Sequence, residues 1–394
     1  MHTNGYQSSY SSTDTAVSPS AQTLLEVKHV SVDYDTARGP LHAVQDVSFT
    51  LKRGQIFGLA GESGSGKSTL AYAIARLLRP PAVITEGEVL FYRRHENDLD
   101  DEIDVFSLSP SQLRAFRWSE LAIVFQSAMN ALNPVISIEK QILDVLQVHD
   151  PGKKRSEYRE RAVELLRLVG IASDRLRSFP HELSGGMRQR AIIAIAMALN
   201  PEIIIMDEPT TALDVVVQRE ILRELMTLRE RFNFSVIFIT HDLSLLLEIA
   251  DAVAIMYAGR LIETATQGEL YHHPLHPYTN GLLNSFPTLH GPQRKLVGIP
   301  GSPPDLRSVP PGCAFHPRCS FAFPPCKTIV PVLLSPKREK PDLRVACHLY
   351  DDDRNPAGPP AQLSAPFVDI ELTQDELPAV VPTPPAKELE GEVQ

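Results

Sequence analysis

The chain has 394 residues, of which 43% are hydrophobic and 22% charged, proportions that exclude fibrous, fully disordered and integral membrane proteins. Its N-terminus is polar, unlike a signal peptide, and its most apolar stretch, Ala191–Leu199, is too short to cross a bilayer, so we expect a chain of the cytoplasm. The formal charge is −10, but ten acids and only two bases lie after Tyr350, and no part of the chain has the basic character of a nucleic-acid-binding protein.

Proline and cysteine divide the chain into regions. Residues 1–23 are rich in Ser and Thr, which predicts a disordered N-terminus. Residues 24–285 have the composition of a compact domain, whereas 21 of the 33 prolines lie after Ser285. We expect an extension over 286–350, which contains all four cysteines, and a disordered acidic tail over 351–394.

Strand and helix patterns alternate along the compact region. Strands are predicted at 24–34, 43–51 and 55–61, then a helix at 65–78. Residues 105–182 are predicted to be largely helical, and helices at 188–199 and 216–232 alternate with strands at 202–208 and 235–240. Continuous apolar strands that alternate with helices are typical of an α/β fold with a mainly parallel sheet.

A phosphate-binding motif follows the third predicted strand. The sequence GESGSGKS matches G-x-x-x-x-G-K-[ST] between a strand and a helix, which is the context that the motif requires. Backbone N–H groups of such a loop bind phosphate oxygens, while its lysine reaches the β- and γ-phosphates and its final hydroxyl binds Mg²⁺. The predicted ATP-binding residues are Gly61, Glu62, Ser63, Gly64, Ser65, Gly66, Lys67, Ser68 and Thr69.

Two adjacent acids end the apolar strand at 202–208. Asp207 is at the position where a carboxylate that holds Mg²⁺ is expected beside a phosphate loop. Glu208 would project to the other face of the strand, where it can deprotonate an attacking water. An ordinary Glu is ionised at neutral pH and therefore needs no special tuning for this role.

The sequence LSGGMRQR, from Leu183 to Arg190, resembles the signature motif of ABC-type ATPases. Ser184, Gly185 and Gly186 precede a helix and form a second phosphate-binding helix N-terminus. One nucleotide does not need two such sites in one chain. The interpretation is therefore that Ser184 and Gly186 bind the γ-phosphate of ATP held by an opposing cassette, with two nucleotides between two head-to-tail cassettes.

The resemblance implies roles for four further residues. Tyr34 matches the aromatic residue that stacks on adenine, and Gln126 matches the glutamine that senses Mg²⁺ and water and links the nucleotide to the membrane partner. Asp214 matches the loop that communicates across the dimer, and His241 matches the histidine that contacts the γ-phosphate and positions the water. The implied fold is a P-loop ABC cassette: a RecA-like α/β core, an antiparallel β subdomain, and a helical subdomain over about 105–185.

Two stretches narrow the resemblance to peptide importers. Residues 125–135, FQSAMNALNPV, are similar to ATPase subunits of oligopeptide and dipeptide importers, and so is the extension that includes GIPGSPPDLRSVPPGCAFHPRC. This resemblance implies an ATP-hydrolysing motor on the cytoplasmic face of the inner membrane. Its implied partners are two membrane-spanning permease subunits, a second and different ATPase, and an extracellular substrate-binding protein. Import of nickel, glutathione or another small solute, and a soluble ABC ATPase unconnected with transport, are the alternatives.

The four cysteines form a separate candidate site. Cys313, Cys319, Cys326 and Cys347 are spaced C-x5-C-x6-C-x20-C, and four thiolates supply the ligands of one iron–sulfur cluster or one zinc ion. The absence of C-x2-C pairs weighs against zinc without excluding it, and inert thiols also remain open. Resemblance to peptide importers favours a [4Fe–4S] cluster. A structural role is predicted, because the cysteines are far in sequence from every nucleotide residue.

Overall fold

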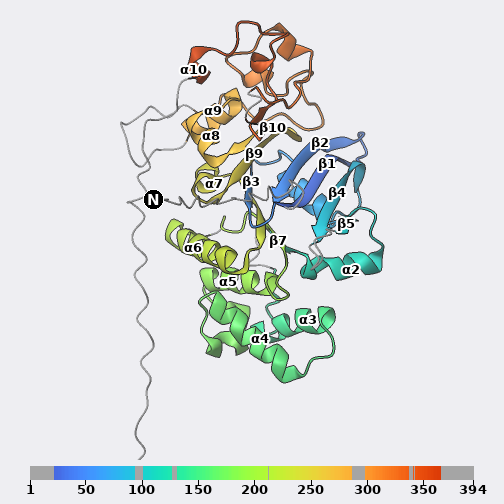
Figure 1. Cartoon of the computed structure of the whole chain (residues 1–394), viewed down its shortest axis with the longest axis vertical. Helices are drawn as coiled ribbons and strands as arrows, with labels where there is room; N and C mark the ends of the chain where they lie inside the picture. The colour runs from blue at the N-terminus through green and yellow to red at the C-terminus, as the bar shows by residue number, and fades with distance from the viewer. Residues whose placement is uncertain are drawn as a thin grey trace, which may run out of the picture.

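The computed structural model describes residues 22–93, 101–126, 131–211, 213–285, 298–336, 340 and 342–364. The described part forms a central sheet with a smaller antiparallel sheet beside it, a helical lobe at one end and the extension at the other (Figure 1). The predicted disorder of the N-terminus and of the end of the tail concerns residues 1–21 and 365–394, which lie outside the described residues. Within the described residues, no helix combines the length and the apolarity needed to cross a bilayer.

The antiparallel sheet has four strands in the order β2-β1-β4-β5. Buried and less buried residues largely alternate along β1 and β2, as the alternation of apolar and polar residues predicts. The bounds are β1 (Thr23–Tyr34), β2 (Leu41–Lys52), β4 (Ala82–Arg93) and β5 (Asp101–Asp104).

The central sheet has seven strands in the order β11-β10-β9-β3-β8-β7-β6. The strands from β9 to β6 are parallel, and every residue of β3, β7 and β8 is buried. The predicted α/β cassette with a mainly parallel sheet is therefore confirmed. The bounds are β3 (Ile56–Ala60), β6 (Leu121–Val124), β7 (Ile203–Asp207), β8 (Ser235–Thr240), β9 (Ala252–Tyr257), β10 (Arg260–Thr266) and β11 (Arg344–Val345).

Each face of the central sheet has its own hydrophobic core. Phe57, Leu59 and Ile205 pack with α1 and the antiparallel sheet, whereas Ile204 and Phe238 pack with the helices on the opposite face. The faces alternate because successive side chains of a strand point to opposite sides. The helices are α1 (Lys67–Ile74), α2 (Pro110–Ser119), α3 (Ile138–His149), α4 (Arg155–Leu168), α5 (Gly185–Ala196), α6 (Val215–Phe232), α7 (Leu243–Ile249), α8 (Gln267–His272), α9 (Pro277–Asn284) and α10 (Ala361–Ser364).

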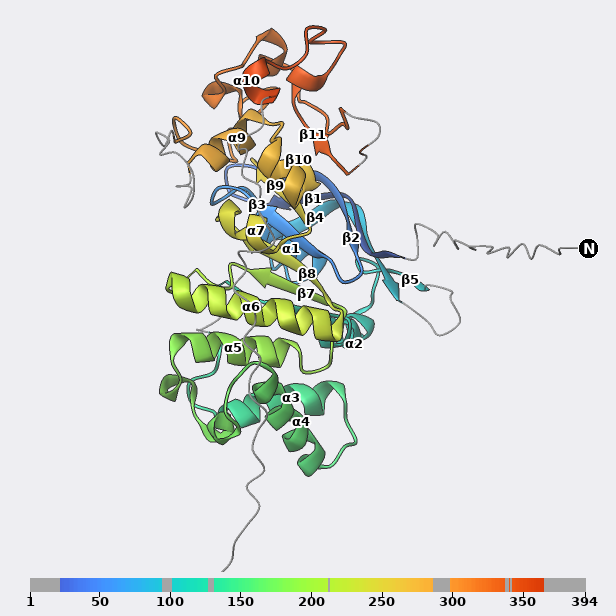
Figure 2. The ribbon, with the colours of Figure 1, turned by 60° about the vertical axis from the view of Figure 1, so that its left-hand side comes forward.

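A strand interrupts the segment 105–182 that the sequence predicted to be largely helical. Residues 121–124 form β6, which pairs with β7 in the central sheet, while α3 and α4 make the helical lobe. The strand was not predicted because a four-residue apolar run is too short for its periodicity to separate strand from helix. In Figure 2, α5 and α6 lie between this lobe and the central sheet.

The extension joins the central sheet and continues beyond residue 350. Its strand β11 pairs with β10, and its short 3₁₀ helices are η5 (His316–Arg318), η6 (Pro324–Lys327) and η7 (His348–Tyr350). Residues 351–364, which were expected to be disordered, have a defined conformation that ends in α10. Leu363 is only 3% exposed and belongs to the core. Two further 3₁₀ helices, η3 (Ser173–Arg177) and η4 (Pro180–Glu182), precede α5.

Candidate nucleotide site

The phosphate loop connects β3 to α1 at the carboxyl edge of the central sheet. Two of its glycines are required by their surroundings: a Cβ on Gly61 would lie 2.2 Å from the Met256 carbonyl oxygen, and one on Gly66 would lie 2.3 Å from that of Ala43. Both have positive φ angles, of 150° and 103°. The loop thus brings backbone N–H groups to the N-terminus of α1, an arrangement that binds anions.

Lys67 is the first residue of α1 and is only 5% exposed. Its ammonium donates hydrogen bonds to the carbonyl oxygens of Gly61 (2.8 Å) and Glu62 (2.9 Å) and to Ser65 Oγ (3.3 Å). Burial lowers its pKa, and the carboxylates of Glu208 and Asp207 oppose that shift. A buried cation whose three donors are directed at its own loop can exchange these bonds for stronger ones to phosphate.

Ser68 and Asp207 form the candidate Mg²⁺ site. The hydroxyl of Ser68 donates to Asp207 Oδ1 at 3.0 Å, across the gap between α1 and the end of β7. Asp207 is fully buried, which raises its pKa, and its Oδ2 is buried with no hydrogen-bond partner among the described residues. A buried carboxylate oxygen without a donor, beside a serine hydroxyl, fits a hard divalent cation.

Glu208 is the centre of a polar network. Gln126 Nε2 and Thr211 Oγ1 each donate to Glu208 Oε2 at 3.1 Å, and His241 Nδ1 lies 3.2 Å from Oε1. The Glu208 backbone has a φ of 45°, in the left-handed region, and its N–H donates to the Ile239 carbonyl oxygen at 2.9 Å. The carboxylate is therefore fixed in position by the side chains of Gln126, Thr211 and His241, as a general base needs to be.

Of the four side chains in this network, three were predicted to belong to the site and one was not. Gln126, Glu208 and His241 were selected from motifs, and the structure brings them together. Thr211 was not among the site residues predicted from the sequence, yet its hydroxyl donates to the same carboxylate oxygen as Gln126. Its position three residues after Glu208 was the only available signal.

Tyr34 lies at the end of β1, close to the phosphate loop. Its hydroxyl is 3.2 Å from the Thr69 hydroxyl on α1, and the side chain is half-buried. The ring therefore lies near the start of the helix that would hold the phosphates. This position suits an aromatic platform for the base of a nucleotide.

Ser184, Gly185 and Gly186 lie at the start of α5 rather than at the phosphate loop. Ser184 is exposed and caps α5 by accepting a hydrogen bond from the Met187 N–H at 3.2 Å. A Cβ on Gly186 would lie 2.7 Å from Val217 Cγ1, so glycine permits the close approach of α5 and α6. Helix α5 packs against α3, α4, α6 and β6.

Asp214 caps the neighbouring helix in the same way. Its Oδ1 accepts hydrogen bonds from the N–H groups of Val216 (3.1 Å) and Val217 (3.0 Å) at the start of α6. Val215 and Val216 are 66% and 77% exposed. The two capped helix ends thus lie beside apolar side chains that the single chain leaves in water.

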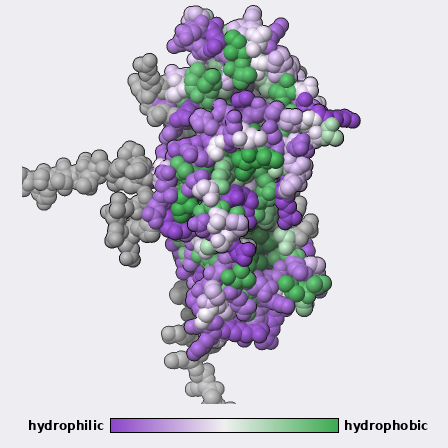
Figure 3. Space-filling view, turned by 90° about the vertical axis from the view of Figure 1, so that its right-hand side faces the viewer, coloured by the Kyte–Doolittle hydropathy of each residue, from purple (hydrophilic) through white to green (hydrophobic). Residues whose placement is uncertain are grey.

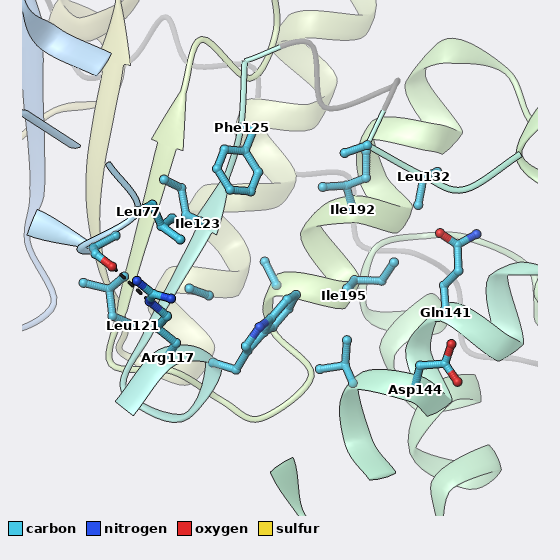
Figure 4. Close-up of a pocket in the computed structure, with 16 residues that line it drawn as sticks. Leu77, Arg117, Leu121, Ile123, Phe125, Leu132, Gln141, Asp144, Ile192 and Ile195 are labelled. Atoms are coloured by element: carbon cyan, nitrogen blue, oxygen red, sulfur yellow. Dashed lines mark hydrogen bonds between the residues drawn. The ribbon is translucent and has the colours of Figure 1, made fainter. Parts of the chain in front are cut away.

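A groove of 390 Å³ lies between the central sheet and the helical lobe. Space-filling Figure 3 shows hydrophobic side chains gathered in a hollow between the upper and lower parts of the molecule. In Figure 4, Phe125 and Ile123 of the β6 segment face Leu132, Ile192 and Ile195 across this space. Phe125, which lines the groove, directly precedes Gln126 of the network around Glu208.

The four cysteines line one small cavity in the extension, of about 10 Å³. Burial is the main cause that raises the pKa of the Cys313 thiol to about 11, and the thiols of Cys326 and Cys319 raise it further. The pKa of Cys347 is also raised, chiefly by burial. Among the described residues, however, no group of three or more His, Cys, Asp or Glu side chains is arranged to hold a metal ion.

Comparison with known proteins agrees with the geometry. A family model described as "ABC transporter" matches residues 44–211, and one described as "Oligopeptide/dipeptide transporter, C-terminal region" matches residues 262–326. The oligopeptide transport ATP-binding protein OppD of Bacillus subtilis is 45% identical over 76% of this chain and 82% of its own length. The dipeptide transport ATP-binding protein DppD of Lactococcus lactis is 44% identical over 76% of this chain and 84% of its own length.

Solved structures support the same assignment. The dimeric structure of MJ0796, a bacterial ABC transporter cassette, matches with a TM-score of 0.54 and 29% identity, over 62% of this chain and 99% of that one. CbiO1 from Clostridium perfringens, part of the ABC transporter complex CbiONQ, matches with a TM-score of 0.53 and 26% identity, over 64% of this chain and 91% of that one. The chain therefore belongs to the ATP-hydrolysing, ATP-binding subunits of the oligopeptide/dipeptide family of ABC transporters.

Proposed function

We propose that this ATPase drives the import of oligopeptides or dipeptides, as a peripheral subunit on the cytoplasmic face of the inner membrane. Residues 24–285 would act as the motor and residues 286–350 as an extension typical of peptide importers. The relatives named as oligopeptide and dipeptide transport proteins support this substrate class. The observation that carries the motor function is the convergence of Lys67, Asp207 and Glu208 at one edge of the central sheet.

In the proposed reaction, the loop N–H groups and Lys67 hold the β- and γ-phosphates. Ser68 and Asp207 would hold Mg²⁺, which neutralises charge on the phosphate oxygens when bound. Glu208 accepts a proton from the attacking water, while Gln126 and Thr211 keep its Oε2 in place and His241 supports Oε1. The lysine stabilises negative charge that develops on the transferred phosphoryl group.

Two cassettes would complete each nucleotide site. Ser184 and Gly186 would bind the γ-phosphate held by an opposing cassette. Two observations support this: the N-terminus of their helix is exposed, and the hydrogen-bond partner found for the Ser184 side chain is Met187 and not a residue of the phosphate loop. Val215 and Val216 beside Asp214 would be covered in the same contact. The second cassette would be a different ATPase subunit of the same transporter.

The groove beside Gln126 would receive one short helix from a membrane-spanning permease subunit. Its apolar walls and its volume suit an amphipathic helical segment. Closure of the cassettes on ATP would move Gln126 and the groove together, which would couple the nucleotide to two permease subunits. An extracellular binding protein would deliver the peptide to them.

Copurification tests this assembly. After expression with the transporter's other subunits and extraction with detergent, tagged wild-type chain should retain both permease subunits. Replacing Ile195 with Glu puts a charge into the groove and should release them, whereas Glu230→Gln on α6 should not. Retention of both permeases by Ile195→Glu would contradict the groove assignment, while an absence of permeases with wild type would contradict the transport function itself.

We further propose that the four cysteines bind one metal centre, a [4Fe–4S] cluster in preference to zinc. Four thiols that line one cavity supply the ligand set for either metal. The described residues show no set of ligands already arranged around an ion, and no step of ATP hydrolysis is assigned to this centre. Anaerobically purified protein should contain about four irons per chain; stoichiometric zinc would contradict the cluster, and metal-free protein would contradict the site.

A further inference from the structure

The extension contacts the phosphate loop directly through Arg318. The guanidinium donates to both carboxylate oxygens of Glu62, from Nη1 to Oε2 at 2.7 Å and from Nη2 to Oε1 at 3.1 Å. The Arg318 side chain is 7% exposed and that of Glu62 is 26% exposed. Because the pair is bidentate and largely buried, it is the strong form of an ion pair and not a solvated surface contact.

Arg318 is itself held in place. Its Nε donates to the Pro300 carbonyl oxygen at 2.8 Å, and its Nη1 to Tyr257 Oη at 3.3 Å. The guanidinium also lies over the rings of Tyr257 and Phe315, 5.9 Å from each centroid. These contacts fix the planar group from several directions, so it can hold Glu62 with little loss of its own conformational freedom.

The aromatic group behind Arg318 also reaches the loop backbone. Tyr278, which is fully buried, accepts a hydrogen bond from the Glu62 N–H at 3.0 Å. Its ring packs against Tyr257 and Phe315, at centroid distances of 4.7 and 5.4 Å. Both the side chain and the backbone of Glu62 are thus held by one cluster, to which the extension contributes Phe315 and Arg318.

The position of Glu62 makes this contact relevant to ATP. Its carbonyl oxygen accepts a hydrogen bond from Lys67, so its carboxylate lies in the same loop that would surround the phosphates. An uncompensated carboxylate there repels a polyphosphate, whereas a carboxylate paired with Arg318 does not. We infer that Arg318 is a positioning residue of the nucleotide site: it neutralises and orients Glu62, and through it the extension sets the affinity of the phosphate loop for ATP.

A purely structural role for Arg318 is the competing explanation. In that case the ion pair would only attach the extension to the cassette, and its loss would lower stability without acting through the charge of Glu62. The two explanations differ in whether the effect of Arg318 on ATP affinity depends on Glu62. A double-mutant cycle measures this dependence.

The test is the Kd for a fluorescent ATP analogue with Mg²⁺, measured on the purified full-length chain. Arg318→Gln should raise the Kd about tenfold, the effect of about one uncompensated charge near the phosphates. Glu62→Gln should lower the Kd about twofold, because it leaves the positive charge of Arg318 unpaired beside the phosphate loop. In the Glu62→Gln background, Arg318→Gln should change the Kd less than twofold.

Arg307→Gln is the matched control, because Arg307 also pairs with a carboxylate in the extension, Asp305, but both side chains are about half exposed. It should leave the Kd unchanged. An unchanged Kd in folded Arg318→Gln, or the same tenfold rise with and without Glu62, would overturn the proposal. If Arg318→Gln does not fold, Glu62→Gln alone decides: weaker ATP binding by this variant refutes the electrostatic role. Lys67→Ala removes the main phosphate contact. Loss of analogue binding by this variant shows separately that the analogue binds at the phosphate loop.

Discussion

Replacing Glu208 with Gln separates ATP binding from hydrolysis. The change keeps the size of the side chain and removes only its ability to accept a proton. An amide oxygen in the place of Oε2 can still accept hydrogen bonds from Gln126 and Thr211, both 3.1 Å from the present carboxylate oxygen. The phosphate loop is untouched, so the Kd for ATP should stay within about twofold of wild type.

The expected loss of turnover follows from the role of the base. A positioned general base contributes about 10²- to 10⁴-fold to a rate, which corresponds to about 3–5 kcal/mol of the activation free energy. The geometry favours at least the middle of this range, because three polar neighbours hold the carboxylate in one place. We therefore expect kcat to fall by about 10³-fold.

The assay is phosphate release by the assembled transporter at saturating ATP, together with nucleotide binding. Glu248→Gln on α7 makes the same chemical change at an exposed position and should hydrolyse ATP like wild type. Hydrolysis by Glu208→Gln within threefold of wild type would refute the assignment of the base. Loss of nucleotide binding together with hydrolysis would show instead that Glu208 holds the loop.

Three further predictions concern assembly, the tail and pH. The isolated chain should hydrolyse ATP slowly, at a rate per molecule that rises with concentration, because each site needs Ser184 of another cassette; fast turnover independent of concentration would contradict this. Truncation after Ser364 should not change the free energy of unfolding in urea, whereas truncation after Tyr350 should lower it by about 2 kcal/mol, because buried Leu363 is lost; equal stability of the two truncations would refute the packing role. Burial raises the pKa of Glu263 to about 7 from its ordinary 4.5. Between these two pH values the folded chain keeps a proton that the unfolded chain has lost. The free energy of unfolding should therefore fall as pH rises from about 4.5 to 7. Glu263→Gln should remove that decrease, and an unchanged pH profile would contradict the assignment.

The site residues that were easiest to predict from the sequence belong to local motifs, in which given residue types occur at fixed spacing. The loop from Gly61 to Ser68 was predictable because its glycines, lysine and serine have fixed offsets between a strand and a helix. Asp207 and Glu208 were predictable for a similar reason, since the end of a buried strand next to a phosphate loop is a known position for acids. Their hydrogen bonds to Ser68 and Gln126 agree with that expectation.

Contacts between distant segments were not predictable from local pattern. Residues 121–124 carry no signal that distinguishes a sheet-edge strand from the start of a helix. Arg318 and Glu62 are 256 positions apart, and nothing in either local sequence indicates that they pair. The cysteines were expected to have only a structural role because they are far in sequence from every nucleotide residue. Arg318 of the same segment contacts Glu62 of the phosphate loop, so distance in sequence no longer supports that expectation.

Uptake of a labelled peptide into vesicles tests the central claim most directly. The complete transporter is reconstituted with the nucleotide site of this chain accessible to added ATP, and uptake is followed with and without ATP. The account predicts uptake that requires ATP and is lost with Lys67→Ala, while an unlabelled peptide competes and nickel or glutathione does not. Uptake without ATP, uptake that survives Lys67→Ala, or ATP-dependent transport of nickel or glutathione in place of peptide would contradict it.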